Sequence, residues 1–325
     1  MKMIGRLIAV LVIVAGMAAV GLAQEYPTRN IEYIVPTLAG GGTDLSSRAI
    51  ADFASKKLGQ AILPVNKPGG GTAVGLAYAM KQAKADGYTV FAETPTSSSM
   101  MVAGMVTPPV LLEDRTFAGR MIVDPMAYAV KVDAPWKTFK EFSAWAKANP
   151  DKLTWVSLGP SSLSAFAIQD WLAAIGADES KTRMVPSAGA VDSMTKVAGG
   201  HVVLASHSVA ECLTLHRAGK VRILAIQSDK RSKYIPDVPT AGEEGVKGLS
   251  VKYWTGVGIR RGTPEPILKK WEKVLAEVSE DPEFKKKVEN FHMEVGFLNT
   301  ANFSKLVSDE AKFYTELAKR IGIRK

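Results

Sequence analysis

One stretch near the N-terminus decides the fold class, and it reads Ile31-Glu32-Tyr33-Ile34-Val35-Pro36-Thr37-Leu38-Ala39-Gly40-Gly41-Gly42-Thr43-Asp44. Its β-branched first part favours a strand, and its three glycines favour a tight turn. Residues 45–58 have helical periodicity and stop before Gly59, a typical C-terminal cap. A strand that passes through a glycine-rich turn into a helix is the unit from which α/β folds are built.

The same unit recurs along the chain. Short β-branched runs alternate with stretches of helical periodicity, which predicts mainly parallel sheets covered by helices. The capping box Thr138-Phe139-Lys140-Glu141 marks the start of one helix. We expect further strands at residues 61–65, 88–92, 153–156, 184–185, 202–205 and 221–226, and helices at residues 73–83, 138–148, 163–174, 190–197, 209–217 and through most of 267–321.

The chain is long enough for two domains of ordinary size, because it has 325 residues. Two apolar stretches, 127–132 and 251–259, lie between the strand–helix blocks and could cross between two lobes. We therefore expect an α/β fold with two lobes, each a mainly parallel sheet flanked by helices, joined by two crossing strands. Lobe 1 would comprise residues 24–122 plus 254–325, and lobe 2 would comprise residues 123–253.

The first 23 residues have the layout of a secretory signal peptide. Lys2 and Arg6 precede an apolar run over residues 7–20, and small residues follow up to Ala23. We expect cleavage after Ala23, which leaves Gln24 at the mature N-terminus and the protein in the periplasm. The alternative is an uncleaved membrane anchor, but the run is shorter than the ~20 residues that a spanning helix needs.

Composition narrows the class of partner. The net charge is +9 and falls to about +7 without Lys2 and Arg6, which gives a mild preference for anionic ligands. Much of this charge lies in Lys and Glu mixtures typical of solvated helix faces, so we expect no nucleic-acid partner. Cys212 is the only cysteine, so it forms no internal disulfide, and we expect it to be a small buried hydrophobic residue.

Six predicted strands are each followed by a loop of small residues with free amides or hydroxyls. In an open α/β sheet the carboxyl ends of the strands form the binding edge. Glycine allows close approach of backbone N–H groups, and a helix N-terminus adds unsatisfied donors. Together these loops predict a pocket for an anion such as a carboxylate. They lie at residues 37–44, 66–72, 93–99, 157–162, 186–189 and 206–208.

Common catalytic motifs are missing from the sequence. It contains no Gly-x-Ser-x-Gly elbow, no Gly-x-x-x-x-Gly-Lys-[Ser/Thr] phosphate loop and no His-Glu-x-x-His pair. The four histidines have no metal-ligand spacing. We therefore expect no catalytic residue, no metal and no cofactor, although an enzyme that uses Asp44 or His207 on a carboxylic acid stays open as an alternative.

Several motifs, in order along the chain, resemble those of the Bug-type solute-binding proteins of tripartite tricarboxylate transporters. Residues 35–44 with Arg48 are similar to the family's first motif, and residues 66–70 to its second glycine loop. The further matches lie at residues 85–89, 135–138, 146–150, 199–200, 218–222, 236–240 and 262–264.

The resemblance implies a two-lobed periplasmic-binding-protein fold of type II, with a carboxylate in the cleft and permease subunits in the membrane as partners. Two departures affect ligand identity: Ala165 stands where relatives often have His, and Ser187 where they often have an aromatic residue. Mapped onto this chain, the ligand-binding residues would be Leu38, Gly41, Gly42, Thr43, Asp44, Thr94, Thr96, Ser97, Ser161, Ser162, Ser187, Gly189, Ser206 and His207.

The expected function is capture of a di- or tricarboxylate, or a related organic acid, by a monomeric exported binding protein. A ligand-sensing subunit that docks on a membrane receptor is an alternative, and an exported enzyme is a further one.

Overall fold

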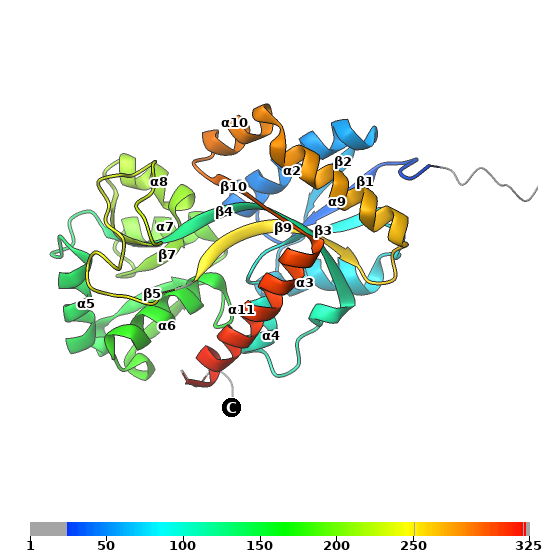
Figure 1. Cartoon of the computed structure of the whole chain (residues 1–325). Coiled ribbons are helices and arrows are strands. Elements are labelled where there is room, and N and C mark those ends of the chain that lie inside the picture. The colour runs from blue at the N-terminus through cyan, green and yellow to red at the C-terminus, as the bar shows by residue number, and fades with distance from the viewer. Residues whose placement is uncertain (1–24, 250, 321, 323–325) are drawn as a thin grey trace, which may run out of the picture.

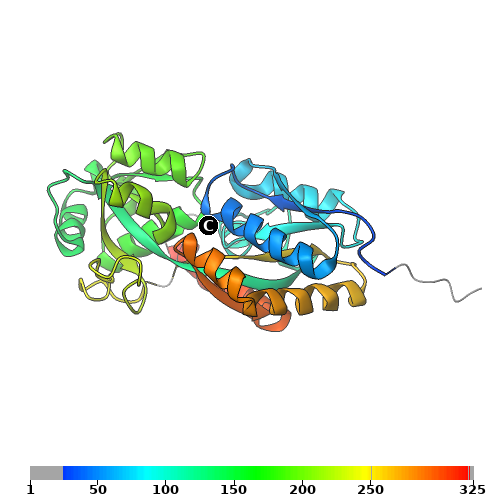
Figure 2. The same ribbon diagram turned by 90° about the horizontal axis from the view of Figure 1, so that it is seen from above.

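The computed structural model describes residues 25–249, 251–320 and 322. The predicted signal peptide and its cleavage site at Ala23 lie outside the described residues. Figure 1 shows two lobes side by side, and the view from above in Figure 2 shows the same division, with residues of the middle of the chain forming one lobe. The N-terminal and C-terminal parts of the chain together form the other lobe, which we call lobe 1.

Lobe 1 is a sheet covered by helices on both faces. Its first three strands run parallel to one another, with β1 between β2 and β3, as the alternating strands and helices predicted. The crossing strand β9 is inserted antiparallel between β3 and β4, and β10 forms the edge. The strands are β1 (Ile31–Val35), β2 (Ile62–Asn66), β3 (Thr89–Glu93), β4 (Arg115–Lys131), β9 (Lys252–Arg260) and β10 (Glu294–Asn299).

The helices of lobe 1 divide between the two faces of this sheet, with α2, α9 and α10 above it and α3, α4 and α11 below it in Figure 1. A short helical turn, η1, precedes α3, and the π-type turn η2 continues it. Their bounds are α2 (Gly42–Leu58), η1 (Gly70–Thr72), α3 (Ala73–Ala77), η2 (Tyr78–Gln82), α4 (Ser99–Gly104), α9 (Glu265–Glu280), α10 (Pro282–Asn290) and α11 (Thr300–Arg320).

Lobe 2 repeats this arrangement. Strands β7 and β8 both pair antiparallel with β4, so they run in the same direction, and β5 pairs parallel with β6. The antiparallel crossing strand is here β4. The elements are α5 (Phe139–Ala148), β5 (Thr154–Ser157), α6 (Leu163–Ile175), β6 (Arg183–Pro186), α7 (Ala190–Ala198), β7 (Ala205–Ser208), α8 (Val209–Arg217) and β8 (Val221–Gln227).

Two strands cross between the lobes, as predicted. Strand β4 pairs with β9 up to Pro125 and with β7 and β8 from Met126 onward, so one strand belongs to both sheets. The chain returns into β9, whose pairing with β4 begins at Lys252. The lobe boundaries expected after residues 122 and 253 stay a prediction; the change of strand partners on β4 falls between Pro125 and Met126.

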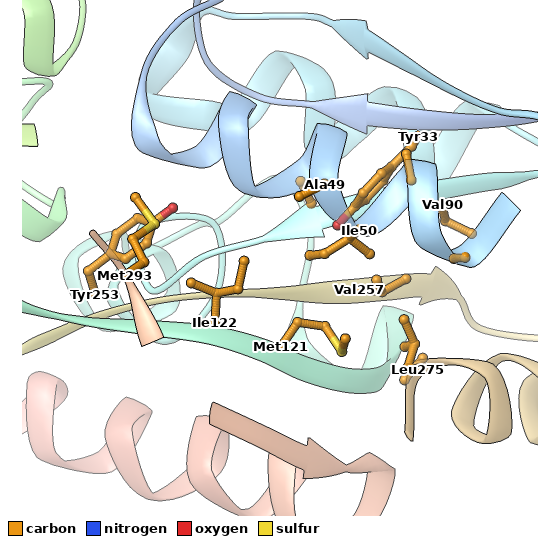
Figure 3. Close-up of a cluster of buried hydrophobic side chains, with 14 of the residues drawn as sticks. Tyr33, Ala49, Ile50, Val90, Met121, Ile122, Tyr253, Val257, Leu275 and Met293 are labelled. Carbon is orange, nitrogen blue, oxygen red and sulfur yellow. The ribbon is translucent and has the colours of Figure 1, made fainter. Parts of the chain in front are cut away.

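Strand periodicity places successive side chains of β1 in different cores. Tyr33 packs under α2 with Ile50, whereas Ile34 packs on the opposite face with Leu76 of α3. Figure 3 shows the first of these clusters, where Tyr33 and Ile50 lie above the crossing strands that carry Ile122 and Val257. This packing fixes the glycine-rich turn between β1 and α2 relative to the crossing strands.

The prediction for the strand at residues 202–205 was wrong by three residues. The strand is β7, Ala205–Ser208, and it pairs with β4 through Ser206 opposite Tyr128 and His207 opposite Ala127. Ser206 and His207 therefore lie within a strand and not in the loop after it. Pairing with a buried neighbouring strand overrides the weak strand preference of serine, because strand propensity depends on context.

Two further features concern single elements. Cys212 in α8 is buried and unbridged, as expected for a small hydrophobic residue. None of the helices in the described part of the chain has both the length and the apolar character needed to span a bilayer.

Candidate functional site

A cavity of about 330 Å³ lies between the lobes, and both contribute to its walls. Lobe 1 supplies the loops after β1 and β3, the start of α2, the turn η1 and one residue of β9. Lobe 2 supplies the starts of α6 and α7 and residues of β7 and α8. The lining residues are Thr37, Leu38, Ala39, Gly41, Gly42, Thr43, Thr72, Thr94, Thr96, Leu158, Ser162, Leu163, Ser164, Ala188, Gly189, Ala190, Val191, Asp192, His207, Glu211 and Tyr253.

The turn between β1 and α2 is held in place by Asp44. Its carboxylate accepts hydrogen bonds from the N–H of Gly40, the Nε of Arg48 and the Nδ2 of Asn66. Burial alone would raise the pKa of Asp44, but the hydrogen bonds from Arg48, Gly40 and Asn66 outweigh it and lower the pKa. Asp44 is therefore a charged support of the turn, and it does not line the cavity.

The loop after β3 brings Thr94 and Thr96 to the cavity and turns Ser97 away from it. Ser97 donates from Oγ to Glu93, and its carbonyl accepts from the Nη2 of Arg115 at 2.9 Å. Glu93 and Arg115 form a fully buried ion pair with an N–O distance of 3.3 Å. A buried charge pair of this kind needs such additional hydrogen bonds, and here they fix the shape of the loop.

Two threonine hydroxyls on the lobe 1 wall are buried without a hydrogen-bond partner, those of Thr37 and Thr72. Thr72 is 3% exposed and has a φ of 83°, a left-handed conformation that is rare for a β-branched residue. Most buried polar atoms in proteins have a partner, and strained residues gather at ligand sites. Both hydroxyls are therefore candidates to bind a ligand.

On the lobe 2 wall, Ser162 caps α6 and Gly189 caps α7. The N–H of Leu163 in the first turn of α6 donates to Thr96 Oγ1 of lobe 1 at 3.0 Å, so the lobes are in contact beside the cavity. Ser187 is turned aside, since its hydroxyl bonds that of Ser193 at 2.7 Å.

His207, which is buried, and Glu211, which is partly buried, form a pair at the junction of the lobes. His207 Nδ1 lies 3.5 Å from Glu211 Oε2, while its Nε2 is buried and has no partner. Glu211 also accepts hydrogen bonds from the N–H of Ser208 and, across the cleft, from the N–H of Gly42 at 3.1 Å. Burial would raise the pKa of Glu211, but the hydrogen bond and charge of His207 and these N–H groups outweigh it and lower the pKa.

The structure brings nine of the fourteen sequence-predicted site residues to the cavity and places five elsewhere. Those at the cavity are Leu38, Gly41, Gly42, Thr43, Thr94, Thr96, Ser162, Gly189 and His207. Those outside its lining are Asp44, Ser97, Ser161, Ser187 and Ser206. Their roles in binding stay predictions.

Several lining residues were not among the fourteen predicted site residues, notably Thr72, Asp192, Glu211 and Tyr253, although Thr72 lies in a loop that was predicted to form the pocket. Glu211 had a usable signal: Ser208 and Glu211 have the spacing of a capping box, and the structure forms that box at the start of α8. Tyr253 gave no local signal, because its hydroxyl reaches the wall only through the packing of β9 against α2.

The cavity contains few charges. Asp192 and Glu211 are the acidic residues of its lining, and no lysine or arginine is among the lining residues that the structure describes. Asp192 is paired with Lys196 at 2.7 Å. Elsewhere in the described ranges, no group of three or more His, Cys, Asp or Glu side chains is placed to hold a metal ion.

Two α/β lobes, crossing strands and an interlobe cavity lined by strand ends and helix N-termini define a solute-binding receptor. The model of the family described as "Tripartite tricarboxylate transporter family receptor" matches residues 46–323. The chain belongs to this family, which confirms the resemblance found in its motifs.

Similar proteins agree with this assignment. A curated relative from Cupriavidus necator, the "UPF0065 protein in gbd 5'region", is 29% identical over 312 residues, which cover 96% of this chain and 93% of the relative. The structure of the periplasmic binding protein BugD has a TM-score of 0.81 at 27% identity and covers 92% of this chain and 100% of its own. An R. palustris protein solved with adipate has a TM-score of 0.84 at 25% identity, with coverage of 92% and 99%.

Proposed function

We propose that this receptor is exported to the periplasm, captures a small organic carboxylate between its lobes and delivers it to permease subunits of a tripartite tricarboxylate-type transporter. Binding would be followed by release of the unchanged acid, with no chemical step. The predicted signal peptide, cleaved after Ala23, supports export. The family supports the permease partner.

The observation that carries the proposal is the interlobe cavity with its unpartnered buried polar atoms, the hydroxyls of Thr37 and Thr72 and the Nε2 of His207. A ligand that bonds these atoms would contact both lobes, since the threonines belong to lobe 1 and His207 to lobe 2. Such a ligand favours the closed arrangement by the contacts that it makes only there. The adipate bound to the R. palustris relative supports a carboxylate as ligand.

The test is thermal unfolding of residues 24–325, unfolded and refolded beforehand to remove co-purified ligand, with a panel of acids. The panel comprises aliphatic, hydroxy and aromatic mono- and dicarboxylates, citrate and amino acids. A ligand present at 100 times its dissociation constant adds about 2.7 kcal/mol to the free energy of unfolding. We expect at least one acid to raise the midpoint by several degrees and to be recovered chemically unchanged.

Failure of every acid to shift the midpoint of correctly folded protein would contradict carboxylate capture. Conversion of a bound acid into a product would contradict the purely binding role.

A further inference from the structure

The N-terminus of α2 already has an anion bound to it, and that anion is part of the chain. Glu211 of lobe 2 accepts the N–H of Gly42 in the first turn of α2. A Cβ built on Gly42 would lie 3.0 Å from the same carboxylate oxygen, so the contact is close-packed. A helix N-terminus is a natural anion site, because its N–H groups lack partners and its dipole is positive. In this protein Glu211 uses one of those N–H groups before any ligand arrives.

Among the described residues, the cavity lining offers no lysine or arginine to bind a ligand anion in addition to the Glu211 carboxylate. Asp192 is paired with Lys196 outside the lining. The imidazole of His207 also lines the cavity, and its Nδ1 faces Glu211 at 3.5 Å. The Nδ1 side of His207 is therefore directed at Glu211.

The rest of the wall suits one carboxylate on an otherwise uncharged molecule. The unpartnered hydroxyls of Thr37 and Thr72 belong to the loops after β1 and β2. Tyr253 comes from β9, which β3 separates from β1 and β2 in the sheet, and its hydroxyl donates to Thr43, the neighbour of the Gly42 that Glu211 binds. The larger aliphatic side chains of the lining are those of Leu38, Leu158, Leu163 and Val191.

We propose that Glu211 makes this cavity selective for monocarboxylates and rejects acids with a second carboxylate. The inference rests on the proposed function and narrows its ligand class. The single carboxylate binds the hydroxyls of Thr37 and Thr72, and the uncharged body of the ligand lies toward Glu211 and His207. A second carboxylate would meet the Glu211 charge in a partly desolvated space, where repulsion between like charges is strong.

The test compares matched acids by isothermal titration on refolded residues 24–325. Each pair differs by one carboxylate: hexanoate with adipate, lactate with malate, and benzoate with phthalate. In every pair of which a member binds, we expect the monocarboxylate to bind at least about ten-fold more tightly, a difference of ~1.4 kcal/mol. Glu211→Gln removes the charge and keeps the shape, so it should reduce this preference by about ten-fold or more.

Glu141→Gln is the matched control, because Glu141 occupies the same third position in the capping box of α5 and does not line the cavity. We expect it to leave the preference unchanged. A dicarboxylate that binds the unaltered protein as tightly as its monocarboxylate, or a preference that Glu211→Gln does not reduce, would overturn the selectivity while the proposed function stands. If Glu211→Gln does not fold, the proposal is decided by whether the unaltered protein prefers each monocarboxylate to its matched dicarboxylate. Absence of binding by every acid would overturn the proposed function and the selectivity together.

Discussion

At the residue scale, Thr72 has two features that lower the stability of the folded chain and that a bound ligand would compensate. Thr72 combines a left-handed backbone with a buried hydroxyl that has no partner. Each feature is unfavourable for the folded chain, the first by about 1–3 kcal/mol and the second by a similar amount. Such a residue is best explained by a function in binding.

Replacement of Thr72 by Val tests this view. Valine has the same shape and the same β-branch, so the backbone strain is kept while the unsatisfied hydroxyl is removed. We expect the free energy of unfolding without ligand to stay unchanged or to rise by up to about 1 kcal/mol. The affinity for the acid identified by thermal unfolding should fall by about five-fold to ten-fold, as measured by isothermal titration.

Thr263→Val is the control for this substitution. Thr263 is also buried, but its hydroxyl donates to the carbonyl of Arg260 at 2.8 Å. Its loss should destabilise the chain by about 1 kcal/mol and leave ligand affinity unchanged. Equal behaviour of the two variants would refute a binding role for Thr72.

At the scale of elements, the C-terminal helix α11 connects the two faces of the cleft. Its Glu310 accepts hydrogen bonds from Ser99 of α4 and from the indole of Trp254 in β9. One turn further along, Tyr314 packs against Phe166 of α6 in lobe 2, with ring centroids 5.2 Å apart. The helix is thus attached to lobe 1 by a partly buried carboxyl group and touches lobe 2 by an aromatic ring.

The Glu310 attachment predicts a pH dependence of stability. Burial raises the pKa of Glu310 from 4.5 to about 7, although hydrogen bonds from Trp254 and Ser99 oppose the shift. The folded chain therefore binds this proton more tightly than the unfolded chain. The stabilisation is complete below about pH 4.5 and is lost as the pH rises to about 7, by up to about 3 kcal/mol.

Glu310→Gln should flatten this part of the stability curve, measured by urea unfolding between pH 5 and pH 8. Glu316→Gln is the control, because Glu316 lies on the same helix but is exposed and pairs only with Lys319 among the described contacts. An equal pH slope in Glu310→Gln and in the unaltered protein would show that Glu310 does not titrate in this range.

The helix and strand boundaries predicted from the sequence can also be compared with those in the structure. The capping box of α5 and the left-handed glycine after α2 lie where the sequence indicated them, because caps depend on neighbouring residues. Strand β7 was misplaced by three residues, because its position depends on pairing with β4, more than seventy residues earlier in the chain.

At the scale of the whole molecule, closure depends on close contact between the lobes outside the cavity. Gly104 at the end of α4 packs directly against Ser161 of lobe 2. A Cβ at Gly104 would lie 2.6 Å from the Cβ of Ser161, closer than side chains approach one another. Ser161, predicted to contact ligand, therefore lies at the lobe contact instead of in the lining.

Gly104→Ala should act as a wedge between the lobes. We expect the affinity for the identified acid to fall by about ten-fold, although no cavity residue is changed, because closed-state contacts contribute to binding. Small-angle scattering of the ligand-saturated variant should give a larger radius of gyration than that of the unaltered protein. Changing Ser161 to Gly in the same chain should restore both values, and unchanged affinity in Gly104→Ala alone would contradict the wedge.

The sequence by itself determined the repeated strand, turn and helix units, the two crossing stretches and the loops that face the cleft. These features follow from periodicity and from neighbouring residues, which are local properties of the chain. The tertiary structure alone decided which side chain of each loop reaches the cavity, as with Thr96 and not Ser97. It also decided that Glu211 bonds Gly42, a contact between residues 169 positions apart. Such contacts depend on how separate elements pack, and no local pattern of residues encodes them.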